Sequence, residues 1–472
     1  MSEFKMTCGI ETHIELATKT KIFCGCTTEF GGAPNTHCCP VCTGQPGSLP
    51  VLNSRVVEYA VMAGLAVNCK INNNSHMDRK NYVYPDLPKA YQISQYDEPL
   101  CEHGYIELDS GKRIGITRIH IEEDAGKLVH ESGRTFIDYN RGGVPLIEIV
   151  SEPDISTPQE AREYAEKLQQ IMRCIGISTC KMQEGRMRCD LNVSIARPGE
   201  PLGTRTETKN VNSFNNIERA ITREIERQED IILSGGKVVQ QTMRYDADRD
   251  EIYPMREKEN SDDYRYFPEP DILRFSVSEE KVEQLRASLP ELPAQKQKRY
   301  VEQLGISAAN AEYLCKYRNV TDYFEATLEL GASAKNTANM IVQTIFAAFD
   351  TEDAKDEFDV KVSAQQLAEL VKLLDEGKIR ANLAHGTLQK MLETGKPVGD
   401  YIKPEDTVGL SADQLRKLCE EAVAANPKAV EDIKNGKDKA INVMFGYIMK
   451  GSRGKADVKA AEAIIREIIL GH

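Results

Sequence analysis

The sequence contains no apolar run that approaches the roughly 20 residues needed by a membrane-spanning helix. Its first residues, Met-Ser-Glu-Phe-Lys-Met-Thr-Cys, have no apolar core of signal-peptide length. We therefore expect a cytoplasmic protein with no membrane contact. The sequence also lacks a Walker-type glycine-rich loop and a Rossmann glycine fingerprint. If ATP binds, we expect it to bind on a sheet through metal and side chains.

Cysteine, by contrast, is plentiful. The chain has 13 cysteines, an odd number, and no secretory signal, which favours free thiols and metal ligands over a disulfide framework. The formal net charge of −13 means that any contact with nucleic acid needs a local cationic patch. We found no internal repeat and no low-complexity segment.

The composition changes near Pro290-Glu-Leu-Pro293. Up to and including that point lie 17 of the 20 prolines and 11 of the 13 cysteines, and beyond it the sequence is rich in Ala, Leu, Lys and Glu. A weaker break falls between residues 399 and 409, where Pro404 separates two helical patterns. We therefore predict three domains, comprising residues 1–292, 293–402 and 403–472.

The segment Cys8–Leu16 alternates with the period of a β-strand. Glu11, His13 and Glu15 share one face of this strand, and apolar residues occupy most of the other face. Two carboxylates around an imidazole can form a surface for a hard cation or for acid/base chemistry. On this segment alone, a solvated strand face is the favoured interpretation.

The segment Asn140–Asp154 places Glu148 inside an apolar run that is typical of a buried strand. A bare buried carboxylate costs several kcal/mol, so protonation, a cationic side chain or a metal must neutralise it. A salt bridge to Arg141 is an equally good hypothesis on this stretch alone. A further β-like segment ends in the acidic run 122–124, and the convergence of these acids with Glu11 and His13 favours a Mg²⁺ site.

Two close pairs of cysteines flank a loop rich in turn-forming residues. Tetrahedral ligation by four thiolates suits zinc, and a closed site of this kind is structural. The Cys-x-Cys spacing of the first pair is less usual, and His37 and Cys38 beside the second pair allow a ligand swap. The predicted zinc knuckle, which spans residues 24–42, uses Cys24, Cys26, Cys39 and Cys42.

Further along, a capping box at Thr157–Glu160 predicts a helix that covers a sheet. The alternation in Met187–Ile195 predicts a strand whose polar face continues through the 205–209 segment and offers a floor for a charged substrate. An ordinary solvent-facing sheet surface is the alternative. Residues 214–233 form another predicted helix, which ends before two glycines.

Two other stretches combine cations with aromatic rings. Asp78–Gln92 interleaves cations with three tyrosines, which suits phosphate or base binding but equally suits a packed loop. Between residues 434 and 459, the sequence has seven Lys or Arg residues and only two acidic residues, both Asp. This patch suits a phosphate backbone, although a solvated lysine-rich helix surface is about as well supported by that segment alone.

Several long motifs, in the same order along the chain, resemble the GatB family, the B subunits of the tRNA-dependent amidotransferase GatCAB. The resemblance runs nearly end to end. It is carried by residues 9–16, 78–85, 120–127, 140–154, 261–271 and 446–454.

The resemblance implies an activity on misacylated tRNA. The side-chain carboxylate of Glu-tRNA(Gln) or Asp-tRNA(Asn) is phosphorylated by ATP and then displaced by ammonia, which the glutaminase subunit GatA supplies in a complex with GatC. It also implies an α+β fold, in which an antiparallel-sheet cradle similar to the glutamine synthetase catalytic fold precedes a helical domain and a tail that contacts tRNA.

By the same resemblance, the catalytic Mg²⁺ falls on Glu11, His13, Glu123 and Glu148. The four cysteines fall on a zinc site that only some members possess. The cations that are candidates for ATP phosphates are Arg79, Lys80, Arg188 and Arg205. The candidates for tRNA contact in the tail are Lys434, Lys437, Lys439, Lys450, Arg453 and Lys455.

Departures from the family pattern are few. Thr12 stands where Val is expected, Tyr447 where Gln is expected, and Val458 where Pro is expected.

Two other classes of protein compete with this interpretation. A metal-dependent ligase acting on a free amino acid leaves the basic tail unexplained. A zinc-containing tRNA-binding scaffold without chemistry leaves Glu148 and the Glu11/His13 face unexplained.

Overall fold

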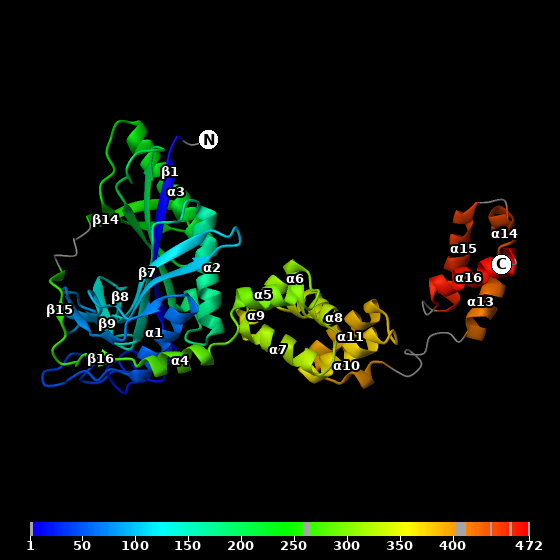
Figure 1. Ribbon diagram of the computed structural model, residues 1–472, viewed down its shortest axis with the longest axis horizontal. Coiled ribbons are helices and arrows are strands. Elements are labelled where there is room, and N and C mark those ends of the chain that lie inside the picture. Colours follow the sequence, from blue (N-terminus) through cyan, green and yellow to red (C-terminus); the bar gives the residue numbers. More distant parts are fainter. Residues whose placement is uncertain (1–2, 258–263, 403–411, 435–436, 453–455, 471–472) are drawn as a thin grey trace. The chain divides into compact units, whose positions relative to one another are not determined.

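The computed structural model of the protein describes residues 3–257, 264–402, 412–434, 437–452 and 456–470 (Figure 1). The chain divides into two compact units, Met1–Lys296 and Gln297–His472. The first unit is mixed α and β around a large sheet, and the second is helical. None of the helices in the described ranges has the length and apolar character needed to cross a membrane.

The first unit is built on a nine-stranded sheet. Neighbouring strands run antiparallel except β12 and β13, which are parallel. In order across the sheet, the strands are β14 (Glu251–Glu257), β13 (Gln241–Asp246), β12 (Thr206–Val211), β11 (Met187–Ala196), β1 (Lys5–Glu15), β10 (Pro145–Ser151), β7 (Arg113–Glu123), β6 (Cys101–Glu107) and β2 (Lys70–Ile71).

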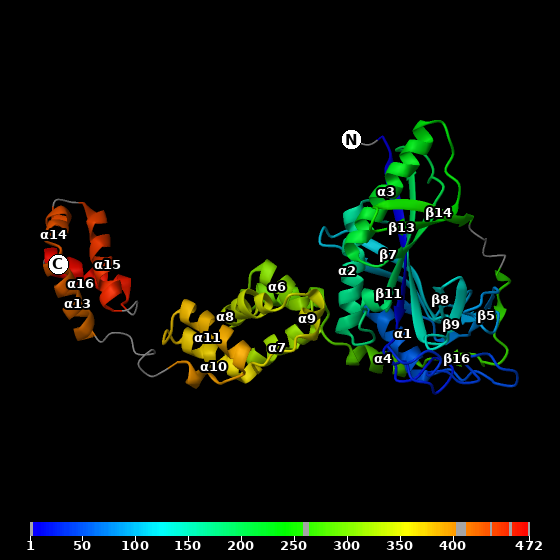
Figure 2. The same cartoon turned by 180° about the vertical axis from the view of Figure 1, so that it is seen from behind.

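The predicted alternation of β1 is confirmed, because Ile10, Thr12 and Ile14 are buried while the residues between them are partly exposed. The apolar face of the sheet shares one core with helices α1 (Ser54–Ala66), α2 (Pro158–Cys174) and α3 (Phe214–Leu233). Figures 1 and 2 show α2 and α3 beside each other along the sheet. The polar face of the central strands is thereby left for a functional site.

The predicted starts of the covering helices are also confirmed. The Thr157 hydroxyl accepts a hydrogen bond from the backbone N–H of Glu160, and Pro158 opens α2. The Glu160 carboxylate does not complete the reciprocal capping box, because it binds the N–H and hydroxyl of Ser156 instead. Helix α3 spans the predicted residues and begins after Ser213, which accepts from the N–H of Asn216.

Several smaller elements complete the first unit. A three-stranded sheet consists of β15 (Phe267–Pro268), β4 (Asp78–Asn81) and β5 (Tyr91–Ser94), so the 78–92 and 264–271 motifs lie side by side. The remaining elements of this unit are the hairpin of β8 (Lys127–Glu131) and β9 (Arg134–Asp138), the pair β3 (Asn74–Ser75) and β16 (Phe275–Ser276), a 3₁₀ turn at Met182–Glu184, and α4 (Glu279–Ser288).

The second unit contains two separate hydrophobic cores. The first core is formed by residues from α5 (Pro293–Glu302) onward, and it includes α6 (Ala308–Cys315), α7 (Arg318–Glu329), α8 (Ala334–Met340), a π-helical turn at Ile341–Ile345, α10 (Ala364–Asp375) and α11 (Ala381–Thr394). The second is formed by α13 (Ala412–Ala425), α14 (Pro427–Lys434), α15 (Ile441–Gly451) and α16 (Val458–Leu470).

The short helix α9 (Glu352–Glu357) precedes α10. The predicted capping box at Ser363 and Gln366 is present in full at the start of α10. The second predicted box begins at Ser411, which lies outside the described residues.

Tyr164 allows a direct test of the packing beneath the sheet. It is fully buried in α2, and its hydroxyl has no hydrogen-bond partner among the described residues. We expect Tyr164→Phe to leave the free energy of unfolding unchanged or to raise it by about 1 kcal/mol, because it removes an unsatisfied buried group. Urea denaturation followed by circular dichroism measures the difference.

Tyr245→Phe is the matched control in the same unit. The hydroxyl of Tyr245 donates to Asp250 at 2.7 Å, so its removal should lower the free energy of unfolding by about 1 kcal/mol. If both variants lost the same free energy of unfolding, this description of the surroundings of Tyr164 would be contradicted.

Candidate active site

Three neighbouring strands bring their side chains into one row on the polar face of the sheet. His13 of β1 pairs with Glu148 of β10, which pairs in turn with His120 of β7. Glu122, two residues further along β7, points to the same face. The Nε2 atom of His13 lies 3.4 Å from Oε1 of Glu122 and 3.4 Å from Oε2 of Glu148.

His13, Glu122 and Glu148 therefore form a cluster that can hold a metal ion. One ligand atom from each lies within 4.8 Å of the others. Both carboxylates are buried, while the His13 side chain keeps 20% of its surface exposed. Two carboxylates and one imidazole with access to solvent suit a cation that also binds water and phosphate oxygens.

The electrostatics of the cluster follow from its burial. Burial alone would raise the pKa of Glu148, but His120 and His13 outweigh it and hold that pKa well below its usual range. Burial alone would likewise lower the pKa of His13, but Glu148 and Glu122 raise it to about 9. A divalent cation would satisfy the same carboxylates and requires His13 Nε2 without its proton.

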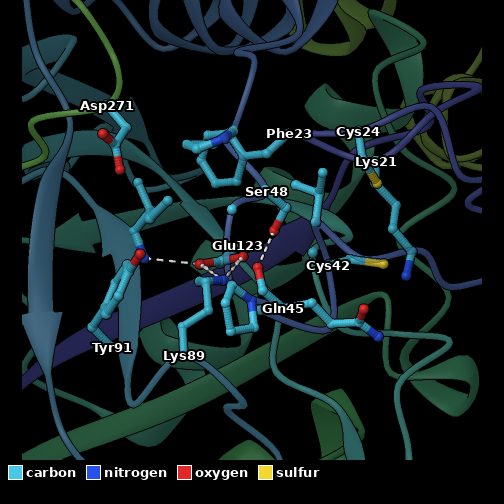
Figure 3. Close-up of a pocket in the computed structure, with 17 residues that line it drawn as sticks. Lys21, Phe23, Cys24, Cys42, Gln45, Ser48, Lys89, Tyr91, Glu123 and Asp271 are labelled. Atoms are coloured by element: carbon cyan, nitrogen blue, oxygen red, sulfur yellow. Dashed lines mark hydrogen bonds and ion pairs between the residues drawn. The ribbon is translucent and has the colours of Figure 1, made fainter.

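Glu123 does not join this cluster, which corrects its prediction as a ligand beside His13 and Glu148. Adjacent residues of a strand point to opposite faces, so Glu122 takes that place. The Glu123 carboxylate instead accepts hydrogen bonds from Lys89 at 2.7 and 2.8 Å and from the N–H of Ile93 at 2.9 Å. It lines a separate cavity of about 220 Å³, in which Figure 3 shows it next to Lys89.

Two other predicted contacts of the cluster differ in the structure. Glu11 lies on the same face of β1 as His13, but its carboxylate accepts a hydrogen bond from Asn192 at 2.9 Å and lies outside the cluster. The hypothesis that Arg141 neutralises Glu148 is wrong. The Arg141 guanidinium donates to the carbonyls of Ala125 and Gly126 instead.

The cluster opens onto a cavity of about 830 Å³. Its walls carry several cations: Lys80 on β4, Arg188 on β11, Lys209 on β12 and Arg244 on β13. Arg188 donates to Asp124 at 2.9 Å, and Lys209 lies 3.1 Å from Asp190. A cavity with a metal-binding cluster and several cations is suited to an anionic, phosphate-bearing substrate.

The four cations predicted to bind ATP phosphates therefore do not share one cavity. Lys80 and Arg188 line the large cavity, while Arg205 lines a neighbouring cavity of about 480 Å³ together with Glu11. Arg79 lines neither of them and is held by Glu269 at 2.6 and 2.8 Å, above the ring of Tyr91. The prediction of Arg79 as a phosphate ligand is not supported by this arrangement.

Sequence reasoning did not select two members of this site. Arg244 gives no signal in the sequence, because only the parallel pairing of β12 with β13 brings it to the cavity. His120 stands out in the sequence only as part of a family motif. Its spacing from Glu122 within one strand would have placed the two on the same face.

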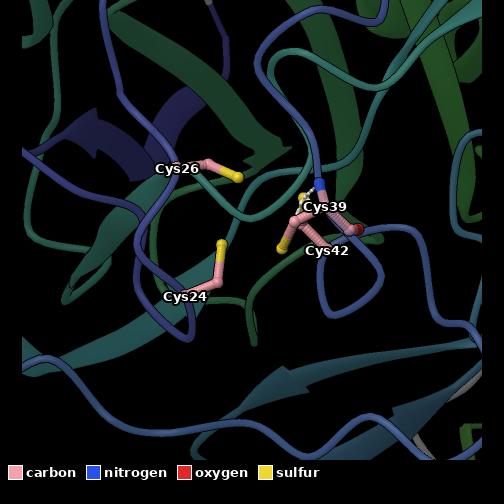
Figure 4. A group of neighbouring side chains, drawn as sticks. All are labelled: Cys24, Cys26, Cys39 and Cys42. Atoms are coloured by element: carbon pink, nitrogen blue, oxygen red, sulfur yellow. Dashed lines mark hydrogen bonds between the residues drawn. The ribbon is translucent and has the colours of Figure 1, made fainter.

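The four cysteines predicted as zinc ligands lie together (Figure 4). Their sulfur atoms all lie within 4.8 Å of one another, so the cluster can hold a metal. The neighbouring Cys38 lies outside it, and its thiol donates to the carbonyl of Asn35 at 3.2 Å. The arrangement favours the original set over a swap with Cys38.

Lys21 places a buried cation beside the thiols. It is fully buried, and its ammonium donates to the carbonyls of Gly142 at 2.6 Å and Tyr139 at 3.2 Å. A hydrogen bond with Cys24, helped by the charge of Lys21, lowers the pKa of Cys42 to about 4. A thiolate is the form that binds metal.

The predicted tRNA-binding cations lie in the last group of helices. Lys434, Lys437, Lys439 and Lys450 are exposed, and Lys437 lies 3.1 Å from Asp432. Arg453 and Lys455 lie outside the described residues. None of these contacts identifies a ligand, so their role stays a prediction.

The large sheet, its buried cluster of carboxylates and a histidine and its cationic cavity have the features of a catalytic domain that acts on anionic substrates, and the cluster can hold a metal ion. The sequence profile of the GatB/GatE catalytic domain matches residues 6–283, and that of the GatB domain matches residues 322–469. The chain belongs to the GatB family.

Similar proteins are known from several bacteria, where each is named as the B subunit of an aspartyl/glutamyl-tRNA(Asn/Gln) amidotransferase. The protein from Thermoanaerobacter sp. (strain X514) is 48% identical over 471 residues, which cover 98% of this chain and 99% of the relative. Those from Carboxydothermus hydrogenoformans and Brevibacillus brevis are 46% and 45% identical, and each alignment covers 99% of both chains.

Proposed function

We propose that this chain is the B subunit of a tRNA-dependent amidotransferase, which converts Glu-tRNA(Gln) or Asp-tRNA(Asn) to Gln-tRNA(Gln) or Asn-tRNA(Asn). The observation that carries the proposal is the cation-lined cavity ending at His13, Glu122 and Glu148, inside the domain that matches the family. The names of relatives aligned over nearly the whole chain support the substrate.

The proposed chemistry has two steps. An oxygen of the substrate's side-chain carboxylate attacks the γ-phosphorus of ATP, and ADP leaves. Ammonia then attacks the carbon of the resulting acyl phosphate, inorganic phosphate leaves, and a proton is lost to give the amide. The first step is needed because a carboxylate is a poor acyl donor: its carbon is a weak electrophile and oxide is a very poor leaving group, whereas phosphate is a much better one. No nucleophile from the protein is required.

In this proposal His13, Glu122 and Glu148 hold Mg²⁺. When bound there, Mg²⁺ neutralises negative charge that develops on the phosphoryl oxygens. Lys80 and Arg188 face the same cavity and are placed to bind phosphate oxygens of ATP. The sheet with helices on one face also suits the predicted resemblance to the glutamine synthetase catalytic fold, which stays a prediction.

The partners are part of the proposal. An amidase subunit, GatA, would release ammonia from glutamine, and GatC would complete the complex, as the family membership implies. A cytoplasmic location follows from the same assignment. The three domains predicted from composition fit the separate cores of the described residues, and we propose them as cradle (1–292), helical (293–402) and tail (403–472) domains.

The experiment that tests the function follows phosphate release from ATP by the chain co-purified with its partner subunits. We expect hydrolysis to require Mg²⁺ and Glu-tRNA(Gln) or Asp-tRNA(Asn), with little activity on uncharged tRNA or free glutamate. Hydrolysis that is indifferent to tRNA would indicate a ligase acting on a free amino acid. Tight tRNA binding without turnover would indicate a scaffold.

The tail cations allow a separate prediction. We expect the triple variant Lys434→Glu, Lys439→Glu and Lys450→Glu to raise KM for the charged tRNA about tenfold, because these cations would contact the phosphate backbone. In a plot of log KM against log salt concentration, the slope should fall by roughly one unit for each lysine replaced, and kcat should stay unchanged.

A triple variant of exposed lysines in the first unit provides the control. Lys70, Lys127 and Lys237 are exposed, and their change to Glu alters the net charge equally. Equal effects of the two triple variants on KM would contradict a specific role for the tail.

A further inference from the structure

His120 lies on the side of Glu148 opposite His13. The three residues are register partners on β7, β10 and β1, so their side chains form one row. Both imidazoles approach the same carboxylate oxygen. Oε2 of Glu148 lies 3.3 Å from Nε2 of His120 and 3.4 Å from Nε2 of His13.

The two histidines have different surroundings. His13 lines the large cavity and keeps 20% of its side chain exposed. The side chain of His120 is only 4% exposed, and the residue is absent from the cavity wall. A metal ion that reaches the cluster from the cavity therefore meets His13 first, while His120 lies behind the carboxylate.

The position of the His120 proton follows from its contacts. Its Nδ1 atom is buried and has no partner among the described residues. An N–H at Nδ1 would be a buried donor without an acceptor, so the proton that the ring must carry lies on Nε2. The oxygens near Nε2 belong to Glu148 at 3.3 Å and Glu122 at 3.9 Å.

We propose that His120 is a positioning residue, whose Nε2–H donates to Glu148 and holds this carboxylate in place to bind the metal with His13 and Glu122. The inference rests on the proposed metal-dependent function. A metal ion held by the cluster would take the lone pair of His13 Nε2, so His13 could then no longer donate a proton to Glu148 through that atom. His120 keeps its proton and supplies the hydrogen bond that orients a ligating carboxylate.

The test compares three substitutions in the complete complex. His120→Gln keeps an N–H donor about as far from the backbone as Nε2, His120→Asn carries its donor one methylene short, and His120→Leu has none. The readout is Mn²⁺ affinity without ATP or tRNA, followed by electron paramagnetic resonance of free Mn²⁺. Glu148→Gln, which lacks a cluster ligand, defines the binding that is not specific to this site.

We expect His120→Leu and His120→Asn to weaken Mn²⁺ binding about 10- to 100-fold, and His120→Gln to stay within about threefold of wild type. The Mg²⁺ concentration for half-maximal activity should rise in parallel, with KM for charged tRNA unchanged. His130→Leu, an exposed change on β8, should have no effect.

Four results would overturn the proposal. Wild-type affinity in His120→Leu would show that the imidazole is not needed, and weak binding in His120→Gln would show that the N–H donor is not what matters. If the leucine variant does not fold, the Gln and Asn variants decide. Equal Mn²⁺ affinities for these two would show that the distance of the N–H donor from the backbone does not matter. Wild type that binds no more Mn²⁺ than Glu148→Gln would remove the metal site itself, and with it the proposed function of the cluster.

Discussion

Glu148→Gln should abolish charged-tRNA-dependent ATP hydrolysis almost completely, by at least about 100-fold in kcat, while the protein stays folded. Glutamine has nearly the same shape as glutamate but no negative charge. The buried Glu148 is one of two carboxylates in the cluster that can hold a metal, and His13 and His120 both lie beside its Oε2 atom. Neutralising it removes an anionic metal ligand and replaces the charged acceptor that the two histidines share with a neutral amide.

The measurement is phosphate release from γ-labelled ATP by the complex, with charged tRNA and Mg²⁺ in excess. Binding of the charged tRNA, measured separately, should change little because the tail is untouched. Glu107→Gln is the control, since Glu107 is an exposed residue of the same sheet, paired with Arg113. Normal turnover in Glu148→Gln would exclude the cluster from the chemistry.

Cys42→Ser should remove one bound zinc per chain and lower the free energy of unfolding of the first unit by on the order of a few kcal/mol. A hydroxyl does not replace a thiolate in a tetrahedral zinc site, and the other three sulfur atoms lie within 4.8 Å of its position. The buried ammonium of Lys21 would then face fewer anionic ligands.

Zinc content by mass spectrometry, together with thermal unfolding, tests this expectation. Cys38→Ser is a matched control, because Cys38 lies four residues before Cys42 in sequence but outside the cluster. We expect it to keep the zinc and the stability of the wild type. Loss of zinc in Cys38→Ser with retention in Cys42→Ser would reverse the ligand assignment, and no zinc in the wild type would remove the site.

Much of the scaffold could be predicted because the local patterns are strong. The alternation in β1 and β11, the hydroxyl cap of Thr157 and the two glycines after residue 233 each fix an element within a few residues. Because successive side chains of a strand point to opposite faces, the residue numbers also fix which side chains share a face. His13 and Glu148 were therefore reachable from the sequence as members of a polar face.

The choice between Glu122 and Glu123 shows where sequence reasoning fails. Ile114 and Ile116 are buried on β7, and so are Ile119 and Ile121, so the buried phase shifts by one residue between the two pairs. The register with β10 shifts at the same place, as expected for a β-bulge. Counting from Ile121 would have put Glu123 on the buried side and Glu122 in the cluster.

Contacts between distant segments could not be predicted by such counting. Arg141 is close to Glu148 in sequence, yet it turns to the carbonyls of Ala125 and Gly126 because the chain bends before β10. Lys89 reaches Glu123 across a loop of the small sheet. These pairings depend on how the elements pack, and no periodicity in the sequence reports them.

The most direct test of the account uses Glu-tRNA(Gln) labelled with ¹⁸O in both oxygens of the side-chain carboxylate. The complex is given ATP, Mg²⁺ and glutamine, and the inorganic phosphate is analysed by mass spectrometry. If a side-chain oxygen attacks the γ-phosphorus, each amide formed releases one phosphate that carries one ¹⁸O atom. Amide formation with unlabelled phosphate would contradict activation through an acyl phosphate, and with it the role we assign to this site.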